Sequence, residues 1–451
     1  MQSGSVRHWF RLLTLPTPWP RAPRATLWFV IVVVVGAASL LVPRTTGWTG
    51  AYLHSEDGQV FLTEFLQGGF GTLFQTYAGY LHLVPRTITA TCGTLAGPLG
   101  FAACINVGSV LVKAAIMVVA FPVLSAYARS WRWGLAAAAL GLLFLPVGQQ
   151  EVLGNLTNLR WFLLAGAFFA VIGVFRARWL VVFAAAVALL AALSDPMPLL
   201  LAPIAIWRLV GMRGWARLPS VLVLVGSVVH LLMLDASARG ERGGIAELLA
   251  VPSQTVGQLL VRGPLTTQWG MTLTQELMLR IGVPLAIATL VLLLVLVVLA
   301  WRGRQIDDPA VPFVILLAVL GTGFLLVTIA FPASYIALAD IWSPSQPARY
   351  SALTGLFLTP ALVLLLSRAW SSARDPVLGR VWTLVMGAVL VLAYVGDAGG
   401  DARNTDGPIW AQTVATAEEL CRAGTVDPSL PNSPVYEGWH TTITCTWLGV
   451  G

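Results

Sequence analysis

The strongest constraint on the fold is a series of long apolar segments that carry no charge. Examples are "TLWFVIVVVVGAASLLV" (26–42), "IGVPLAIATLVLLLVLVVLAW" (281–301) and "VPFVILLAVLGTGFLLVTIAF" (311–331). Each is about as long as the roughly 17 to 25 residues that a bilayer-spanning helix needs. Only 10% of the 451 residues are charged, against roughly 25% in soluble proteins. The sequence therefore predicts an all-α polytopic membrane protein.

The hydropathy pattern predicts about eleven transmembrane helices and three regions of chain. The first apolar run is interpreted as a retained helix, because many further spans follow it and no signal-peptidase site ends it. A cytoplasmic N-terminus (1–24) precedes a transmembrane domain (25–396), and a polar tail (397–451) follows it. The predicted spans lie roughly at 25–43, 105–127, 134–147, 161–175, 179–193, 198–211, 218–234, 281–301, 310–331, 351–367 and 380–396.

The arginines give these spans an orientation. Short cytoplasmic loops are enriched in Lys and Arg, and one assignment satisfies this rule along the whole chain. It places the N-terminus inside, and the tail and the active region outside the cytoplasm. The arginines that then face the cytoplasm are Arg7, Arg11, Arg21, Arg24, Arg129, Arg132, Arg176, Arg178, Arg208, Arg213, Arg217, Arg302, Arg304, Arg368, Arg374 and Arg380.

The acidic residues divide in the opposite sense. Only Asp307, Asp308 and Asp375 fall on the cytoplasmic side. The outer face holds the segments 44–104, 148–161, 235–280, 332–350 and 397–451. The first is long and apolar, so we expect it to form amphipathic helices at the outer membrane surface. Its part 83–104 is also compatible with a dip into the bilayer.

All four cysteines fall on the predicted outer face, where an oxidising compartment allows disulfides to persist. A bridge between Cys421 and Cys445 is expected to staple a tail too small for a large core of its own. The spacing leaves open whether Cys92 and Cys104 pair. No metal-site spacing is present in the sequence.

Several function classes lack their motifs. The chain has no G-x-S-x-G elbow, no P-loop and no dinucleotide-binding fingerprint opening a helix. A net charge of +7 without a basic stripe or RNA-binding motif argues against a nucleic-acid partner. Ion-coupled transport usually needs ionisable residues within spans. The only such candidate is Lys113, with His230 near a span end.

The segment "HSEDGQ" (54–59) opens the first outer loop with an acidic pair, Glu56 and Asp57. An acidic pair after the first span, followed by membrane-lying helices, resembles the GT-C glycosyltransferases. The stretches "YAGYLHLVPR" (77–86), "GNLTNLRWFLL" (154–164) and "PARY" (347–350) resemble a bacterial branch of membrane proteins of this type. The resemblance implies transfer of a sugar from a polyprenyl-phosphate donor to a cell-envelope glycan, or to a protein, outside the bacterial plasma membrane.

The resemblance also implies roles for individual residues. Asp57 is the expected general base of an inverting reaction, with Glu56 as its helper, as an acceptor ligand or, alternatively, as the base itself. Arg is suited to a lipid phosphate because its guanidinium is a planar fork of donors. The expected phosphate ligands are Arg349 first, then Arg160, Arg86 and His82; the expected sugar or acceptor ligands are Tyr80, Asn155, Asn158, Asp195 and Tyr350.

Simpler interpretations stay open for the same residues. The acidic pair also fits a solvated interfacial turn, and Arg349 or the Arg160–Trp161 pair fits membrane-interface anchors. No cofactor follows from the sequence, and enzymes of this kind work with or without a divalent metal. Two other functions fit the composition: a transporter or flippase of lipid-linked glycans, and a non-catalytic envelope assembly protein. In the tail, Trp410, Tyr436, Trp439 and Trp447 also suit a carbohydrate-binding lid.

Overall fold

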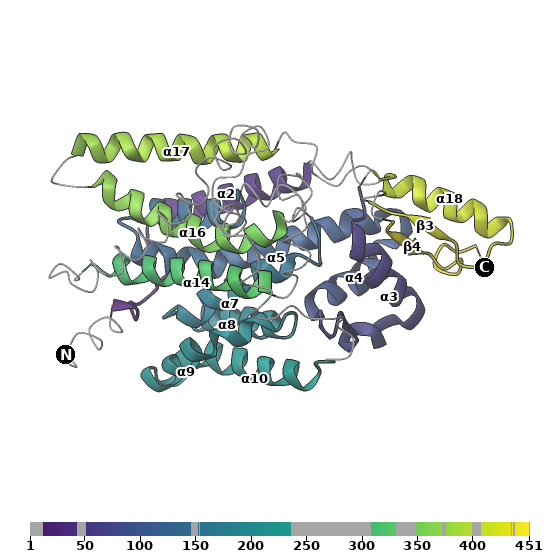
Figure 1. Ribbon diagram of the computed structural model, residues 1–451, viewed down its shortest axis with the longest axis horizontal. Coiled ribbons are helices and arrows are strands. Elements are labelled where there is room, and N and C mark those ends of the chain that lie inside the picture. Colours follow the sequence, from purple (N-terminus) through teal and green to yellow (C-terminus); the bar gives the residue numbers. More distant parts are fainter. Residues whose placement is uncertain are drawn as a thin grey trace.

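The protein is a bundle of helices, with the segment after the first helix and the C-terminal segment gathered at one end (Figure 1). The computed structural model describes residues 12–42, 51–145, 152, 154–235, 308–330, 348–371, 376–398, 407–433, 435 and 438–450. The bundle helices are α2 (Pro23–Leu41), α5 (Gly97–Tyr127), α6 (Trp131–Leu142), α7 (Leu159–Ile172), α8 (Arg178–Ala192), α9 (Ala202–Gly211), α10 (Leu218–Leu232), α14 (Ala310–Ala330), α16 (Ala348–Trp370) and α17 (Pro376–Ala398).

Five helical segments in the described chain are long and apolar enough to cross a membrane. They are Pro23–Leu41, Gly97–Tyr127, Gly214–Leu232, Ala310–Thr328 and Ser351–Trp370. The remaining apolar helices are shorter, and α6 has only 12 residues, below the roughly 17 that a span needs. The chain is therefore a helical membrane protein, and the number of crossings stays a prediction. The predicted span at 281–301 lies outside the described residues.

Several helices carry apolar side chains on their outer surface. On α17, Val377 is 70% exposed, Leu384 64% and Val395 58%. On α2, Val34 is 60% exposed. A continuous exposed apolar surface is unfavourable in water, whereas the acyl chains of a bilayer solvate it. These faces are consistent with contact to lipid.

Among the described helices, the boundaries follow the predicted spans to within a few residues, except at the end of α6, which stops at Leu142, and at the start of α5. The sequence predicted this helix from residue 105, but it begins at Gly97 and has 31 residues. Gly97 has φ +63° and Pro98 lies in the first helical turn. Pro is favoured there because its missing N–H needs no helical partner. The predicted first outer loop, 44–104, therefore ends near residue 96.

That loop forms a small helical layer. It consists of the π-helix η2 (Asp57–Leu62), α3 (Thr63–Gly68), the 3-10 helix η3 (Gly69–Phe74), a hairpin of β1 (Thr76–Tyr77) and β2 (Tyr80–Leu81), and α4 (Leu83–Leu95). The hairpin is antiparallel and pairs Thr76 with Leu81. A disulfide between Cys92 and Cys104 ties the end of α4 to the beginning of α5.

The tail packs against this layer. It contains α18 (Trp410–Arg422) and an antiparallel pair, β3 (Ser429–Pro431) and β4 (His440–Thr442). The expected disulfide between Cys421 and Cys445 is present. The indole N–H of Trp410 donates to the Pro98 carbonyl, and that of Trp447 donates to the Gly93 carbonyl at 3.0 Å. Trp410 is buried and so is unavailable to a carbohydrate, whereas Trp439 and Trp447 are half-buried and their part in a carbohydrate-binding lid stays a prediction. Tyr436 lies outside the described residues.

The long helix α5 connects two chemically different ends of the bundle. Near its start, Pro98 contacts the tail. At its other end, the Tyr127 carbonyl accepts a hydrogen bond from Arg368 Nη2 at 2.9 Å. A helix of this length spans about 45 Å, more than the roughly 30 Å hydrocarbon core. We call the end that holds the loop and the tail the tail end (Figure 1).

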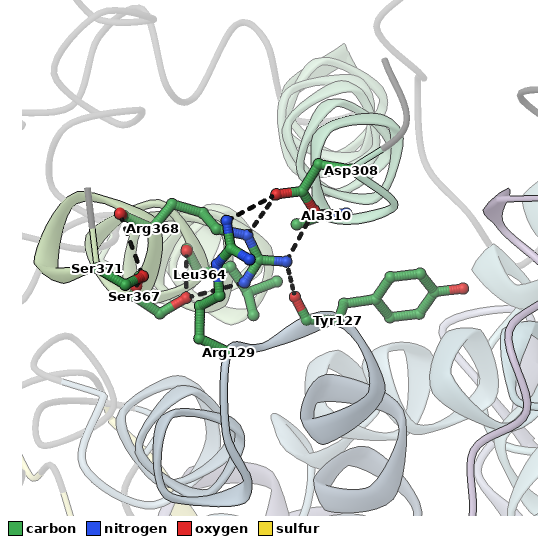
Figure 2. Close-up of polar contacts among 8 residues, drawn as sticks. All are labelled: Tyr127, Arg129, Asp308, Ala310, Leu364, Ser367, Arg368 and Ser371. Carbon is green, nitrogen blue, oxygen red and sulfur yellow. Dashed lines mark hydrogen bonds and ion pairs between the residues drawn. The ribbon is translucent and has the colours of Figure 1, made fainter. Parts of the chain in front are cut away.

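The opposite end of the bundle contains an ion-pair cluster (Figure 2). Asp308 accepts from Arg368 Nε at 2.7 Å and from Nη2 at 2.8 Å, and Arg129 Nη2 lies 3.6 Å away. Burial raises the pKa of the Asp308 carboxyl, but the hydrogen bonds from Arg368 and the Ala310 N–H, with the charges of both arginines, lower it overall. Asp308 was one of three acids predicted beside the cytoplasmic arginines, and it contacts two of them.

Candidate functional site

Segments far apart in the sequence meet at the tail end. The "HSEDGQ" turn lies against the segment 154–158 that leads into α7. The Leu83 N–H donates to the Leu193 carbonyl at 3.3 Å, and the Val84 N–H donates to Ser194 Oγ at 3.0 Å. The Asp235 N–H donates to the Gly79 carbonyl at 3.0 Å. The ends of α8 and α10 and the first-loop hairpin therefore surround one polar region.

Asp57 lies at the centre of this contact and is almost fully buried, with 1% of its surface exposed. Its carboxylate accepts from the Leu156 N–H at 3.0 Å and from the Thr157 N–H at 3.3 Å. The Thr157 hydroxyl is 3.4 Å from the same oxygen. These donors lie just before the N-cap of α7, Asn158, so the carboxylate is also near the positive end of the helix dipole. Asp57 thus ties the first-loop turn to the entry of α7.

A chain of polar side chains extends this network. The Asn155 amide donates to His54 Nδ1, and its oxygen accepts from the Asn158 N–H at 3.0 Å. The Asn158 oxygen in turn accepts from the indole of Trp161 at 3.3 Å. His54, Asn155 and Asn158 are all buried. Buried polar groups that have partners fix a local conformation, so the predicted sugar ligands Asn155 and Asn158 orient the turn instead of facing solvent.

Glu56 has a different environment from its neighbour. It is half-buried, and its charge acts on the hydroxyl of Tyr77 in the hairpin. Burial, and then the charge of Glu56, raise the pKa of Tyr77 to about 12. Successive residues of a helical turn point about 100° apart. The two adjacent acids therefore separate, with Asp57 inside the protein and Glu56 at its polar surface.

Arg160 occupies the first turn of α7 beside the hairpin. Its guanidinium donates to the Tyr80 hydroxyl and lies 3.8 Å from Asp195 Oδ2. It also stacks on Trp161, with Cζ 4.0 Å from the ring centre. Its side chain is 22% exposed, whereas Asp195 is 3% exposed and caps the Met197 N–H at 2.8 Å. Three residues predicted separately, Tyr80, Arg160 and Asp195, thus form one group.

His82 and Arg86 lie deeper in the same region. The His82 ring packs on Tyr80 with 4.3 Å between ring centres and is fully buried. Burial first, and then the charges of Arg160 and Arg86, lower the pKa of His82 well below its usual value. Arg86 is also buried and pairs with Glu64 at 2.7 Å. Both form a layer behind Arg160.

Two predicted ligands lie outside this description. Arg349 and Tyr350 fall in the first turn of α16, and their side chains are outside the described residues. Asp57 and Asn158 both lie buried at the entry of α7, whereas a contact of Arg349 with them stays a prediction. Among the residues described, no group of three or more His, Cys, Asp or Glu side chains is placed to hold a metal ion.

Four residues contribute to the region without having been predicted from the sequence: Glu64, Tyr77, Thr157 and Asn432. Tyr77 could have been predicted, because it is the first residue of the quoted stretch "YAGYLHLVPR". Glu64 and Thr157 gave no pattern of their own. Asn432, in the tail, donates to the Ser55 carbonyl at 3.0 Å across 377 residues of sequence. No local signal announces such a contact.

No protein-family model matches the chain, and no curated protein matches it either.

Proposed function

We propose that the protein is a GT-C-like glycosyltransferase that acts at its tail end. It takes a sugar from a polyprenyl-phosphate donor and passes it to a cell-envelope glycan outside the cytoplasm. The supporting observations are that the charges of Glu56, a half-buried carboxylate, and of Arg160 both act on the Tyr77 hydroxyl, and that the partly exposed Arg160 lies beside Tyr80 and Asp195. The reaction needs a carboxylate and a cation together. The carboxylate acts as a base and takes up the acceptor's proton, while the cation stabilises the leaving phosphate.

We assign the base to Glu56, the alternative that the sequence left open, and give Asp57 a positioning role. A base must come within about 3 Å of the acceptor hydroxyl. The Asp57 carboxylate is enclosed and already holds the 156–157 backbone, whereas Glu56 reaches the polar surface. A carboxylate that deprotonates the acceptor opposite the leaving group gives inversion at the anomeric carbon.

Arg160 is the described cation best placed for the donor phosphate. Its pairing with Asp195 is long, at 3.8 Å, and its side chain is partly exposed. Arg86 is engaged by Glu64, and His82 is enclosed, so both support Arg160 from behind. Arg349 remains a proposed ligand from the start of α16.

The orientation proposed from the arginine pattern agrees with the chemistry of the two ends. Both disulfides lie at the tail end, and disulfides persist in oxidising compartments. The opposite end holds Arg129 and Arg368 with Asp308. We therefore propose that the tail end faces outward from a bacterial plasma membrane.

The buried residues of α5 weigh against a transporter. In its first half, Asn106, Ser109 and Lys113 are buried, and the Lys113 ammonium lies 4.3 Å from the Phe162 ring centre. In its second half, every buried residue from Ile116 to Leu124 is apolar. A path for a polar substrate would need polar groups throughout the span. The polar stretch of α5 instead stops midway, as expected for a site at one end.

The decisive experiment measures sugar transfer from polyprenyl-phosphate donors by the purified protein in lipid. Native protein is compared with Glu56→Gln at equal membrane abundance, and Glu419→Gln on the exposed face of α18 is the matched control. We expect transfer by the native protein and by the control, and its loss in Glu56→Gln. If no lipid-linked donor supports transfer, the proposed function is wrong. If Glu56→Gln transfers normally, the base is misassigned.

A further inference from the structure

The tail makes backbone hydrogen bonds directly to the "HSEDGQ" turn. The Ser433 N–H donates to the Leu53 carbonyl at 3.1 Å, and the Ser55 N–H donates to the Ser433 carbonyl at 2.6 Å. His54, between them, forms a parallel β-bridge with Ser433. One residue of the tail, Ser433, thus pairs with the residues immediately before the acidic pair.

Ser55 has an uncommon backbone conformation. Its φ is +32°, in the left-handed region that non-glycine residues avoid for steric reasons. Neighbouring structure must hold such a residue in place. Here the tail holds both of its backbone polar groups, because Ser433 accepts from its N–H and Asn432 Nδ2 donates to its carbonyl at 3.0 Å. Asn432 itself is 2% exposed.

The position of the acidic pair depends on this turn. The Asp57 N–H donates to the His54 carbonyl at 2.8 Å, so the turn at Ser55 and Glu56 is closed on itself. Beyond it, a Cβ on Gly58 would overlap Thr441 Oγ1, and the His440 N–H donates to Gln59 Oε1 at 3.1 Å. The tail therefore covers the turn on both sides of the two carboxylates.

We propose that Asn432 is a positioning residue, which holds Ser55 in the left-handed conformation and thereby fixes the directions of Glu56 and Asp57. The tail is then a part of the catalytic end of the protein. The effect on turnover rests on the proposed function, whereas the hold on Ser55 does not.

The contact by which Asn432 holds Ser55 can be tested without an activity assay. All four cysteines of the chain are in disulfides, so an introduced thiol is the only one available to a maleimide. Ser433 is fully buried, and Ser433→Cys is a near-isosteric probe of the tail contact. We expect Asn432→Ala to accelerate labelling of this probe roughly tenfold, as loss of one buried hydrogen bond implies. Gln412→Ala, an exposed amide on α18, is the matched control and should change nothing.

Rescue by glycine separates this hold from general packing. Glycine adopts positive φ without steric cost, so Ser55→Gly should restore slow labelling in the Asn432→Ala protein. In the transfer assay, we expect Asn432→Ala to lower kcat about tenfold with unchanged KM for the donor, and Ser55→Gly to recover most of it. Unchanged labelling, equal acceleration by Gln412→Ala, or no rescue by Ser55→Gly would each overturn the proposal. Absence of transfer by the native protein would instead refute the proposed function alone.

Discussion

The two ends of the bundle both contain charged residues, but the charges are arranged differently. At the Asp308 end, one carboxylate meets one guanidinium in a two-point contact of 2.7 and 2.8 Å. At the tail end, Arg86 and Glu64 form a pair of 2.7 Å, but Arg160 and Asp195 are 3.8 Å apart, and the Asp57 carboxylate accepts from the backbone N–H groups at 156–157. Short two-point pairs stabilise a structure. Loosely paired charges beside a surface carboxylate remain available to a ligand, and perturbed titratable groups cluster at functional sites.

The largest expected effect is on turnover at the tail end. Glu56→Gln removes the proposed base while keeping its size, so we expect transfer to fall by roughly 10²- to 10⁴-fold. Unfolding in detergent should change little, because the side chain is half-buried. If Asp308→Asn, at the other end, reduces turnover of the folded protein as strongly, then turnover does not depend on the tail end alone.

The next effect is on stability at the tail end. The Leu156 and Thr157 N–H groups donate to the two oxygens of the Asp57 carboxylate. Asp57→Asn replaces one of these acceptor oxygens with an NH2 donor. We expect a loss of about 1.5 to 3 kcal/mol in the free energy of unfolding, measured by chemical unfolding in micelles, together with a smaller loss of transfer than in Glu56→Gln. A stable Asp57→Asn protein without transfer would return the base to Asp57.

A smaller loss of stability is expected at the opposite end. Arg368→Ala removes the two-point contact to Asp308 and the bond to the Tyr127 carbonyl. We expect unfolding to become easier by about 1 to 2 kcal/mol, with transfer per folded molecule preserved. Arg132→Ala, exposed at the same end, is the control. Equal effects of the two changes would show that the cluster contributes no stability of its own.

The smallest effect is a pH dependence at the tail end. Burial and neighbouring cations lower the pKa of His82, so the unfolded chain binds this proton more readily than the folded one. The contribution to stability is therefore complete above pH about 6.5, the usual histidine value, and is lost as the pH falls below it. His82→Gln should be less sensitive to acid than the native protein over this range. His440→Gln, exposed on the tail, should retain the native sensitivity.

The sequence was sufficient to predict the described helices of the bundle, because uncharged apolar runs leave few alternatives in a bilayer. It misplaced the start of α5, since Pro98 breaks a helix when it lies inside one but starts a helix from its first turn. The pairing of Asp308 with predicted cytoplasmic arginines also follows from charge placement.

The site was only partly predictable. The sequence named Asp57 and Asn158 as candidate site residues, but it treated Glu56 and Asp57 as nearly interchangeable. Their difference comes from the helical rotation between neighbours and from the N–H groups at 156–157, which a linear pattern does not display. The role of Asn432 depends on a tertiary contact with no local signature.

The contact between Ser55 and the tail also has a consequence for biosynthesis. The turn is translated early, whereas Asn432 follows it by 377 residues. During that interval every span between them is made and inserted, and the turn lacks the partners that hold its left-handed residue. The acidic pair can therefore reach its final arrangement only after the tail has been synthesised and has packed against the turn. A chain that stalls during insertion would be unable to complete its site.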